Sequence, residues 1–549
     1  MDKMNLIENT KDGRFYLIQN KITNEIVGFK CTFCEYYNRG KKPGGSFYKH
    51  IRNCALNSNF EYDVQREDRE LFAKLQLELM AIDFDSPHCL CSPAKKELYQ
   101  FLINYGHSAA IKAPKCPPPK IEQLLFDRTV LFRKLENAIS NDFPEIKQKI
   151  QKLVKNNSGC VIIDMIGKSK HYFGIVLHVF DDNWNLKVLP LDIQLFEEDA
   201  TGENVYNKTK EVLNEYGIEI EDVSYKTGEE TNMLLNFNNV EKTSCVSHFL
   251  KNIINGLLIF DEESDDSQTV DKNIKDLMDI IEKIKEIVSL LNFRTNLQSQ
   301  LNLKLINDME NDGLSKFHLA KQFLNLTTND LEILKSSDEP LPNIIQFLLQ
   351  NKEKIMDFVN FISKFEEILL ILQESEKPTI HLIKPLFVQL EKQLKEWSNN
   401  GSEIYKSLSK SALLFWNLKI DEFSDEIYDI SCFLNPNQLP NLSNYFDDDI
   451  LQKMKNYSFA DDQVLRYFQE DVPKINDESF NLNEWWKKYE LLHQIIGKLA
   501  KKILAIPATT SSMENLISYL NSMKPYERNK MKDVTISNLV KYKTMGQFQ

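Results

Sequence analysis

The stretch between residues 160 and 193 constrains the fold of this chain more than any other feature. It consists of three short apolar runs, rich in β-branched and aromatic side chains, at residues 160–164, 171–180 and 186–193. Runs of this length and composition, set at hairpin spacing, predict three consecutive strands.

A helix and a fourth strand are predicted directly after these runs. Thr201 is suited to cap the helix, and one helical face is made of Val205, Thr209, Val212 and Leu213. The fourth strand is predicted at 218–227. Together the four strands and the helix indicate an α/β unit in the middle of the chain.

Most of the remaining chain has the pattern of helices. Two are predicted at Leu71–Ile82 and Ile121–Ile139, with a proline-rich break between them at 114–119. After an acidic run, a long helical region carries one apolar stripe, formed by Leu277, Ile280, Ile284, Ile287 and Leu291. Such a stripe is typical of a core or a partner-helix face. The predicted fold class is therefore α+β, with several domains.

Composition limits the class of protein. The chain has 549 residues, of which 42% are apolar and 27% charged, which suits a globular protein of two to four domains. Its first ten residues lack the apolar core of a signal peptide, and no apolar run approaches the roughly 20 residues that span a bilayer. Nine cysteines in so long a chain predict a metal site and free thiols in a reducing compartment. We therefore expect a soluble, intracellular protein.

Charge is distributed unevenly. Residues 1–60 carry ten Lys or Arg and five Asp or Glu, a local charge of +5, whereas the rest of the chain carries −18. Contacts to phosphate supply most of the sequence-independent affinity for nucleic acid. The charge pattern therefore predicts that DNA is held at the N-terminal end.

The basic segment contains a complete set of four metal ligands. Cys31 and Cys34 form a Cys-x-x-Cys knuckle, and His50 and Cys54, four residues apart, share one face of a helix. Such a set can close a tetrahedron around zinc, and the metal would replace the missing core of so short a segment. The alternative is a chance coincidence of four soft residues. A second cluster of His88, Cys89, Cys91 and Cys116 lacks a matching pair, which favours ordinary buried thiols.

The residues Ile506-Pro-Ala-Thr-Thr-Ser-Ser-Met-Glu514 resemble the last catalytic segment of hAT-type (hobo/Activator) transposases. In this resemblance the zinc segment is similar to a BED finger, a DNA-binding module. The order of three strands, a helix and a fourth strand is that of an RNase H-like core. The residues that would face DNA in the finger are Lys41, Lys42, Lys49 and Arg52; the alternative is that each is a solvated surface charge.

The resemblance covers nearly the whole chain and implies five domains. They are a ββα-type BED finger at 1–60, a helical linker or dimerisation region at 61–150, the first part of the RNase H-like core at 151–262, a large all-helical insertion at 263–483, and the return of the core with a dimerisation region at 484–549. Further matches are 370–385, 432–436, 484–488 and Glu527–Met531. The expected apolar contacts of a dimer are Val534, Ile536, Leu539 and Val540.

The catalytic positions are the most informative part of the resemblance. DDE transposases use three carboxylates around two divalent metal ions, one activating the attacking oxygen and one stabilising the leaving oxygen. The first position falls on Asp164 and the third on Glu514, but the second falls on Gly228. We therefore expect no competent metal site, with Mg²⁺ or Mn²⁺ as cofactor only if another acid completes the set.

Three acids lie near the position of the missing carboxylate in the sequence: Asp222, Glu229 and Glu230. Asp222 lies six residues upstream on the predicted strand, about 20 Å away at about 3.3 Å per residue. Glu229 is one residue from position 228, so on a strand its side chain would point to the opposite face. Glu229 or Glu230 would reach the site only if the loop bends.

Other positions near the implied site also depart from the family. Cys245-Val-Ser-His248 matches the family's Cys-x-x-His, which makes His248 the active-site histidine; the pair alone has the pattern of buried packing residues. Leu297 stands where the family has a Trp that handles flipped bases, and an aliphatic side chain offers no plane for stacking. Asn515 replaces a cation beside Glu514, which is otherwise an ordinary acid in the first turn of a helix.

These observations leave three classes of function. The favoured one is a domesticated, transposase-derived DNA-binding protein of the nucleus, a chromatin- or transcription-related adaptor without strand-cleavage activity. Its partners would be DNA, further copies of itself and nuclear proteins, and its cofactor would be Zn²⁺ in the finger. The alternatives are an active hAT-type transposase, and an interaction scaffold in which zinc serves folding only.

Overall fold

The computed structural model describes residues 4–8, 15–20, 23, 25–31, 36–39, 46–47, 49–50, 93–112, 128–166, 172–227, 236–238, 240–257, 271–301, 312–338, 340–444, 450–458, 461–468, 480–522 and 533–548. The chain divides into two compact units, Met1–Leu125 and Phe126–Gln549. The described part combines α-helices with two small sheets, as the predicted α+β class requires.

The first unit contains a four-stranded antiparallel sheet of order β1-β2-β3-β4. Its strands are β1 (Met4–Glu8), β2 (Phe15–Asn20), β3 (Ile26–Cys31) and β4 (Tyr37–Arg39). Phe15, Phe29 and Phe47 form a small aromatic core, with ring centroids 5.7–6.0 Å apart. The expected ββα arrangement thus has too few strands, because residues 4–20 add two strands to the sheet.

The rest of the first unit includes a helix that the sequence pattern did not predict. This helix, α4 (Pro93–Lys112), begins with a proline, which suits a first helical position. The helix predicted at Leu71–Ile82 and the cluster of His88, Cys89, Cys91 and Cys116 lie outside the described residues.

The second unit is built on a mixed five-stranded sheet of order β7-β6-β5-β8-β9. Its strands are β5 (Cys160–Ile166), β6 (Tyr172–Phe180), β7 (Leu186–Leu195), β8 (Ser224–Thr227) and β9 (Lys242–Thr243). Strands β5, β6 and β7 pair antiparallel, whereas β8 pairs parallel to β5 and β9 parallel to β8. The three predicted strands are confirmed, as is α7 (Gly202–Glu215), whose cap Thr201 accepts a hydrogen bond from the Asn204 amide.

The fourth predicted strand is shorter than expected. Residues 220–222 form a 3-10 turn, η2 (Ile220–Asp222), and only β8 is a strand. The hydroxyl of Ser158 donates to the Asp222 carbonyl oxygen at 2.6 Å, which fixes this turn against the start of β5. Asp222 therefore lies in a turn, and its predicted strand position was wrong.

Helices cover both faces of the sheet. On one face, α6 (Phe143–Asn157) and α7 bury a cluster that includes Val161, Ile163 and Ile175. On the other face, α22 (Ser511–Ser522) and α24 (Asp533–Met545) bury a cluster that includes Ile162 and Val176. Because side chains alternate along a strand and both faces of the sheet are covered, the apolar run 160–163 of β5 is continuous up to Asp164. A further helix, α5 (Arg128–Asn141), packs on α24 and begins seven residues after the predicted Ile121, within the described part.

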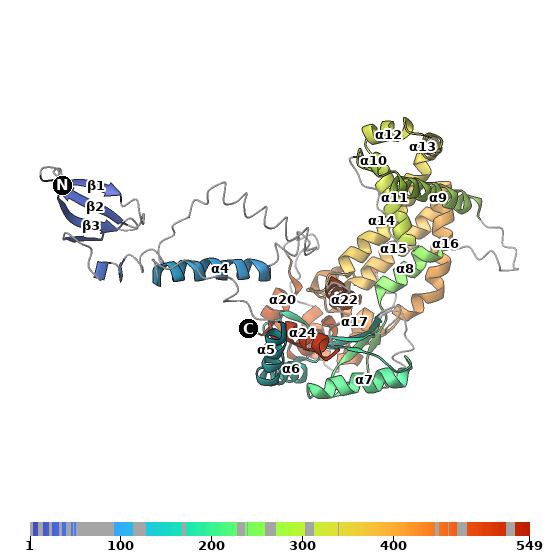
Figure 1. Ribbon diagram of the computed structural model, residues 1–549. Helices are drawn as coiled ribbons and strands as arrows, with labels where there is room; N and C mark the ends of the chain where they lie inside the picture. Colours follow the sequence, from blue (N-terminus) through green and yellow to red (C-terminus); the bar gives the residue numbers. More distant parts are fainter. Residues whose placement is uncertain are drawn as a thin grey trace. The chain divides into compact units, whose positions relative to one another are not determined.

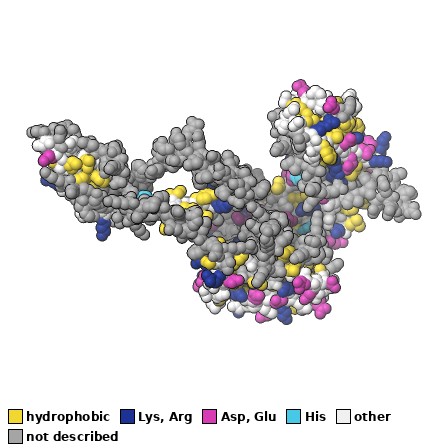
Figure 2. All heavy atoms as spheres, viewed as in Figure 1, with side chains coloured by type: hydrophobic (Ala, Val, Ile, Leu, Met, Phe, Trp, Pro, Cys, Tyr) yellow, Lys and Arg dark blue, Asp and Glu magenta, His cyan; other side chains and the backbone are white. Residues whose placement is uncertain are grey.

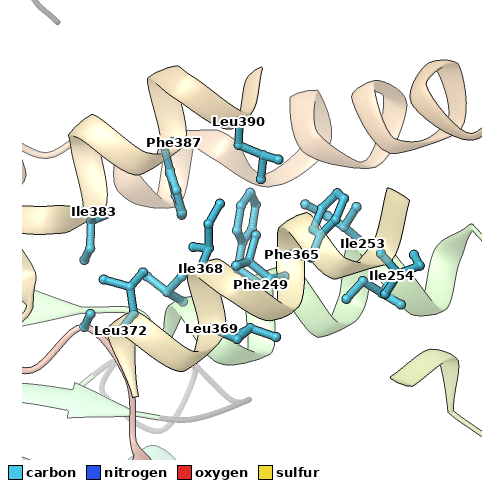
Figure 3. Packing of buried hydrophobic residues seen from close by; sticks show 14 of the residues in the cluster. Phe249, Ile253, Ile254, Phe365, Ile368, Leu369, Leu372, Ile383, Phe387 and Leu390 are labelled. Atoms are coloured by element: carbon cyan, nitrogen blue, oxygen red, sulfur yellow. The ribbon is translucent and has the colours of Figure 1, made fainter. Parts of the chain in front are cut away.

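The helices of the long helical region lie together in Figure 1, and their buried side chains belong to one apolar core. Its helices are α8 (Val246–Gly256), α9 (Lys272–Phe293), α10 (Thr295–Gln298), α11 (Gly313–Leu324), α12 (Thr328–Lys335), α13 (Leu341–Gln350), α14 (Lys352–Leu372), α15 (Ile383–Asn400), α16 (Glu403–Lys419), α17 (Glu426–Phe433), α18 (Ile450–Ser458) and α19 (Asp461–Phe468). The predicted apolar stripe of α9 is buried, as expected. Figure 3 shows the centre of this core, where α8, α14 and α15 meet through Phe249, Phe365 and Phe387.

Two more helices, α20 (Leu482–Tyr489) and α21 (Gln494–Leu504), return the chain from the helical region to the sheet. Within the described residues, no helix is long and apolar enough to cross a membrane. The described surface carries acidic and basic side chains interspersed on the face seen in Figure 2.

Candidate functional site

The 506–514 segment joins α21 to the first turn of α22 and is almost wholly buried. The Val246 amide donates to the Ala508 carbonyl oxygen at 3.1 Å, and the Ala508 amide donates to Thr379 Oγ1 at 2.8 Å. The Thr510 amide donates to Cys245 Sγ at 3.3 Å. The segment is therefore held by the start of α8 and by the residue before η4 (Ile380–Leu382).

Two serines extend these contacts to the sheet and to the end of α14. Ser512 Oγ lies 2.9 Å from His178 Nε2 on β6, and Ser511 Oγ donates to the Gln373 carbonyl oxygen at 2.8 Å. These bonds connect residues that are 334 and 138 positions apart in the chain. They set the position of the first turn of α22, which carries Glu514.

Asp164 and Glu514 belong to elements that pack on each other, since α22 contacts β5. Val161 and Ile163 face α6 and α7, whereas Ile162 faces α22. By strand alternation, Asp164 lies on the same face as Ile162, the face that α22 covers. Its Oδ1 accepts a hydrogen bond from the Met165 amide at 2.9 Å, and its side chain is half-buried.

Glu514 is half-exposed and has a cation beside it. Lys251 Nζ, on α8, lies 3.8 Å from Glu514 Oε1. His248 is half-buried on the same helix, one turn before Lys251. The structure thus brings α8, with His248 and Lys251, next to α22, the helix with the third carboxylate position.

The second carboxylate position lies outside the described residues, as do Glu229 and Glu230. The last paired residues of the β5–β8 ladder are Ile163 and Thr227, directly before Asp164 and Gly228 in the sequence. Asp222 precedes Ser224, whose partner on β5 is Cys160, four residues or about 13 Å from Asp164. Asp222 therefore does not replace the missing carboxylate, as the sequence analysis expected.

Four other predicted positions have structural roles in the described part. Cys245 is buried and accepts from Thr510, so packing is its visible role. Leu297, in α10, packs against the helical core. Ile536 and Val540 are buried against the sheet of their own chain, so the dimer contact expected of these two residues was wrong, whereas Val534 is 66% exposed and Leu539 is half-buried.

The anchoring of α24 was not foreseen from the sequence. Asp192 of β7 is buried, accepts from Ser537 Oγ at 2.6 Å, and pairs with Lys541 Nζ at 3.3 Å. Thr544 Oγ1 donates to the Pro190 carbonyl oxygen. The sequence signals of this contact are an acid within the apolar run of β7 and the small polar residues Ser537 and Thr544 in α24.

In the first unit, two of the four proposed zinc ligands lie around one aromatic residue. Cys31 ends β3 and is buried, and its amide donates to the Tyr36 carbonyl oxygen at 2.9 Å. The ring of Tyr36 stacks on His50 with centroids 4.1 Å apart. This arrangement fits a site that draws on both the β3–β4 hairpin and the following helical residues. Lys49 is exposed, whereas Cys34, Cys54, Lys41, Lys42 and Arg52 lie outside the described residues.

Two sequence families match parts of this chain. Residues 463–543 match the "hAT family C-terminal dimerisation region", and residues 145–227 match a "Domain of unknown function (DUF8247)". The chain is also similar to a curated protein, "Transposable element Hobo transposase" of Drosophila melanogaster. The two are 21% identical over 483 residues, which cover 72% of this chain and 71% of that protein. The dimerisation region and the similarity to the Hobo transposase support a place for the chain in the hAT superfamily of transposase-related proteins.

Proposed function

We propose that this chain is a transposase-derived DNA-binding protein of the nucleus that forms a homo-oligomer and does not cut DNA. In this role it is a chromatin- or transcription-related adaptor. The observation that carries the proposal is the identity of the residues at the three catalytic carboxylate positions. Asp164 and Glu514 are carboxylates, whereas the second position is Gly228.

The surroundings of Glu514 support the same proposal. Lys251 Nζ lies 3.8 Å from Glu514 Oε1, so the carboxylate already has a cation within ion-pair distance. Two-metal catalysis needs a clamp that holds both ions a few ångströms apart. Two carboxylates, one of them beside an ammonium group, do not fit that requirement, and we derive no metal-dependent step for this site.

An RNase H-like identity of the core is part of the proposal. It is supported by three antiparallel strands, the crossover helix α7, and the return of β8 parallel to β5. The proposed homo-oligomer is supported by the match to a dimerisation region.

DNA binding is assigned to the N-terminal finger, with Zn²⁺ held by Cys31, Cys34, His50 and Cys54. The local charge of +5 in residues 1–60 supports it, because phosphate contacts by Lys and Arg release counterions and favour association. The proposed contacts to phosphate are Lys41, Lys42, Lys49 and Arg52.

Metal titration with a cleavage assay tests the absence of catalysis. Magnesium and manganese are titrated into the full chain by calorimetry, and cutting of DNA with transposon-like ends is measured in parallel. We expect no cutting and no metal binding that depends on Asp164, so Asp164→Ala matches the wild type. Asp222→Ala is the control, because Asp222 lies in a turn beyond the Cys160 end of β5, and Cys160 is about 13 Å along the strand from Asp164.

An active transposase is the second candidate, favoured by the placement of Asp164 on the face that α22 covers. Glu229 or Glu230 would then supply the missing carboxylate. Cutting by the wild type that is lost in Asp164→Ala, but kept in Asp222→Ala, would establish this candidate. If Gly228→Asp fails to raise metal affinity, the site is not simply a triad that lost one acid.

A further inference from the structure

A cleft in the second unit is lined by residues that the proposed function does not use. Its volume is about 440 Å³, within the range of about 300–1,000 Å³ that is typical of small-molecule sites. One wall is a face of α21, whose lining residues follow helical spacing: Ile495, Lys498, Leu499 and Lys502. The other walls are the last turn of α6, the turn η2 and the end of α18. We call this space the α6–α21 cleft.

The walls of the α6–α21 cleft are fixed by hydrogen bonds. Ser158 Oγ donates to the Asp222 carbonyl oxygen, which ties η2 to the end of α6. Asn157 Nδ2 donates to the last carbonyl oxygen of β6 at 2.9 Å. On the opposite wall, the Ile495 amide donates to Gln463 Oε1 at 2.9 Å, which holds the first turn of α21 against α19. The cleft is therefore formed before a ligand binds, which lowers the ordering cost of binding.

Three lysines line the cleft without an ion-pair partner among the described residues. They are Lys155 of α6 and Lys498 and Lys502 of α21. An ammonium group donates hydrogen bonds and accepts none, so the three together suit an anion with several oxygen atoms. Phosphate is such an anion, and its bonds to ammonium groups are charge-assisted and strong. The lysines therefore indicate a phosphate group in the ligand.

Two carboxylates line the same cleft and indicate a second part of the ligand. Glu221 and Asp222 lie in η2, and neither forms an ion pair with a described residue. Carboxylates accept hydrogen bonds and donate none, so they suit hydroxyl groups. Ser458, at the end of α18, also lines the cleft, and its buried hydroxyl oxygen has no hydrogen-bond partner within the described part. A buried hydroxyl without a partner is costly, and a polar ligand would remove that cost.

We propose that the α6–α21 cleft binds a small phosphorylated polyol. The lysines bind its phosphate, and Glu221 and Asp222 accept from its hydroxyl groups. A nucleotide fits less well, because the described lining has no aromatic ring on which a base would stack. The DNA backbone also fits less well, since it brings phosphates without free hydroxyl groups, and the two carboxylates would repel those phosphates. The site is separate from the finger and does not depend on its binding to DNA.

Calorimetric titration of the full chain with inositol monophosphate tests the proposal. Inorganic phosphate and inositol are the two partial probes. We expect inositol monophosphate to bind, and each partial probe to bind at least about tenfold more weakly, because it engages only one set of groups.

A pair of lysine variants tests the phosphate side of the site. Lys498→Ala/Lys502→Ala should raise the dissociation constant of inositol monophosphate at least about tenfold, since it removes two charge-assisted contacts. Lys487→Ala/Lys488→Ala is the matched control, because these lysines are exposed on α20 and do not line the cleft. Far-ultraviolet circular dichroism verifies that each variant is folded.

The double variant Glu221→Gln/Asp222→Asn tests the hydroxyl side of the site. It should reduce the preference for inositol monophosphate over inorganic phosphate at least about threefold, because a neutral amide oxygen accepts from a hydroxyl more weakly than a carboxylate does. Its affinity for inorganic phosphate should be equal to or higher than that of the wild type, since two negative charges are gone.

Three results would overturn the proposal. One is a wild type that does not bind inositol monophosphate at millimolar concentrations. Another is an equal loss of binding in Lys487→Ala/Lys488→Ala, which would make the effect one of general surface charge. A third is inorganic phosphate that binds as tightly as inositol monophosphate, which would reduce the cleft to a site for a bare anion.

DNA affinity, measured on the same samples at two salt concentrations, separates this site from the finger. Unchanged DNA affinity in Lys498→Ala/Lys502→Ala, together with the loss of inositol monophosphate, supports a separate ligand site. A fall in DNA affinity in this variant, with no binding of inositol monophosphate by the wild type, would assign the two lysines to a DNA surface and overturn the proposal.

Discussion

His381 lies in the 3-10 turn η4, where its side chain is only 6% exposed. Burial lowers its pKa from 6.5 to about 3, because the charged imidazolium is poorly solvated there. Its Nδ1 also has no hydrogen-bond partner. A single residue with these properties makes the stability of the helical region depend on pH.

The stability of the chain is therefore expected to fall in mild acid. As the pH drops through 6.5, the unfolded chain takes up a proton at His381, but the folded chain does so only near pH 3. Between these values each pH unit costs about 1.4 kcal/mol, or about 2 kcal/mol from pH 7 to pH 5. Urea unfolding followed by tryptophan fluorescence measures this loss.

The comparison between two histidine variants isolates the effect. His381→Gln should reduce the loss between pH 7 and pH 5 by about 2 kcal/mol, since glutamine does not titrate. His318→Gln, at a histidine that is 45% exposed in the same helical region, is the comparison variant. Equal pH dependence in wild type and His381→Gln would show that this histidine is not responsible.

At the scale of elements, the three strands between residues 160 and 195 were predicted well, whereas two of the four expected dimer contacts, Ile536 and Val540, were not. The apolar run of β5 identified a strand because both faces of the sheet are covered. Apolar and polar residues at 218–223 predicted a longer fourth strand. In the structure, Asp222 instead lies in a turn, which the hydrogen bond from Ser158 holds in place. The apolar stripe of α24 was assigned to a partner chain. Periodicity shows that a helix buries a face, but not whether the covering surface belongs to the same chain.

The contact between α24 and the sheet leads to a prediction for Asp192. Asp192→Ala removes the buried acceptor of Ser537 and one of the two carboxylates that pair with Lys541, the other being Glu215 at 3.2 Å. Breaking a buried pair costs about 3 kcal/mol. Urea unfolding should show this loss, whereas Glu211→Ala, at an exposed pair with Lys208, should cost under about 0.5 kcal/mol. A loss no larger than that of Glu211→Ala would mean that the apolar face alone holds α24.

At the scale of the whole molecule, the chain consists of two units whose stabilities can be measured separately. All five tryptophans belong to the second unit, at residues 184, 397, 416, 485 and 486. The four proposed zinc ligands belong to the first unit. The four-ligand spacing predicts a zinc site because soft ligands in pairs are rare, and that site stays a prediction, whereas the two additional strands before Cys31 carry no such signal.

Chelation should therefore affect one unit alone. We expect one zinc per chain by elemental analysis, and we expect a chelator to abolish salt-dependent DNA binding while tryptophan fluorescence stays unchanged. His50→Ala should lose zinc, whereas His107→Ala, an exposed residue of α4, should keep it. Full DNA affinity without zinc would refute the proposed finger.

The buried 506–514 segment has a consequence for the synthesis of this protein. Ser512 meets His178 across 334 residues of chain, and α22 covers the sheet face that contains Ile162 and Val176. At a synthesis rate of about 5–20 residues per second, roughly 20 to 70 s pass between the synthesis of His178 and that of Ser512 in α22, the helix that covers this face. During this interval an apolar sheet surface is open to water, which is the condition in which nascent chains aggregate or engage chaperones. A stop codon shortly before residue 506 would make that transient state permanent.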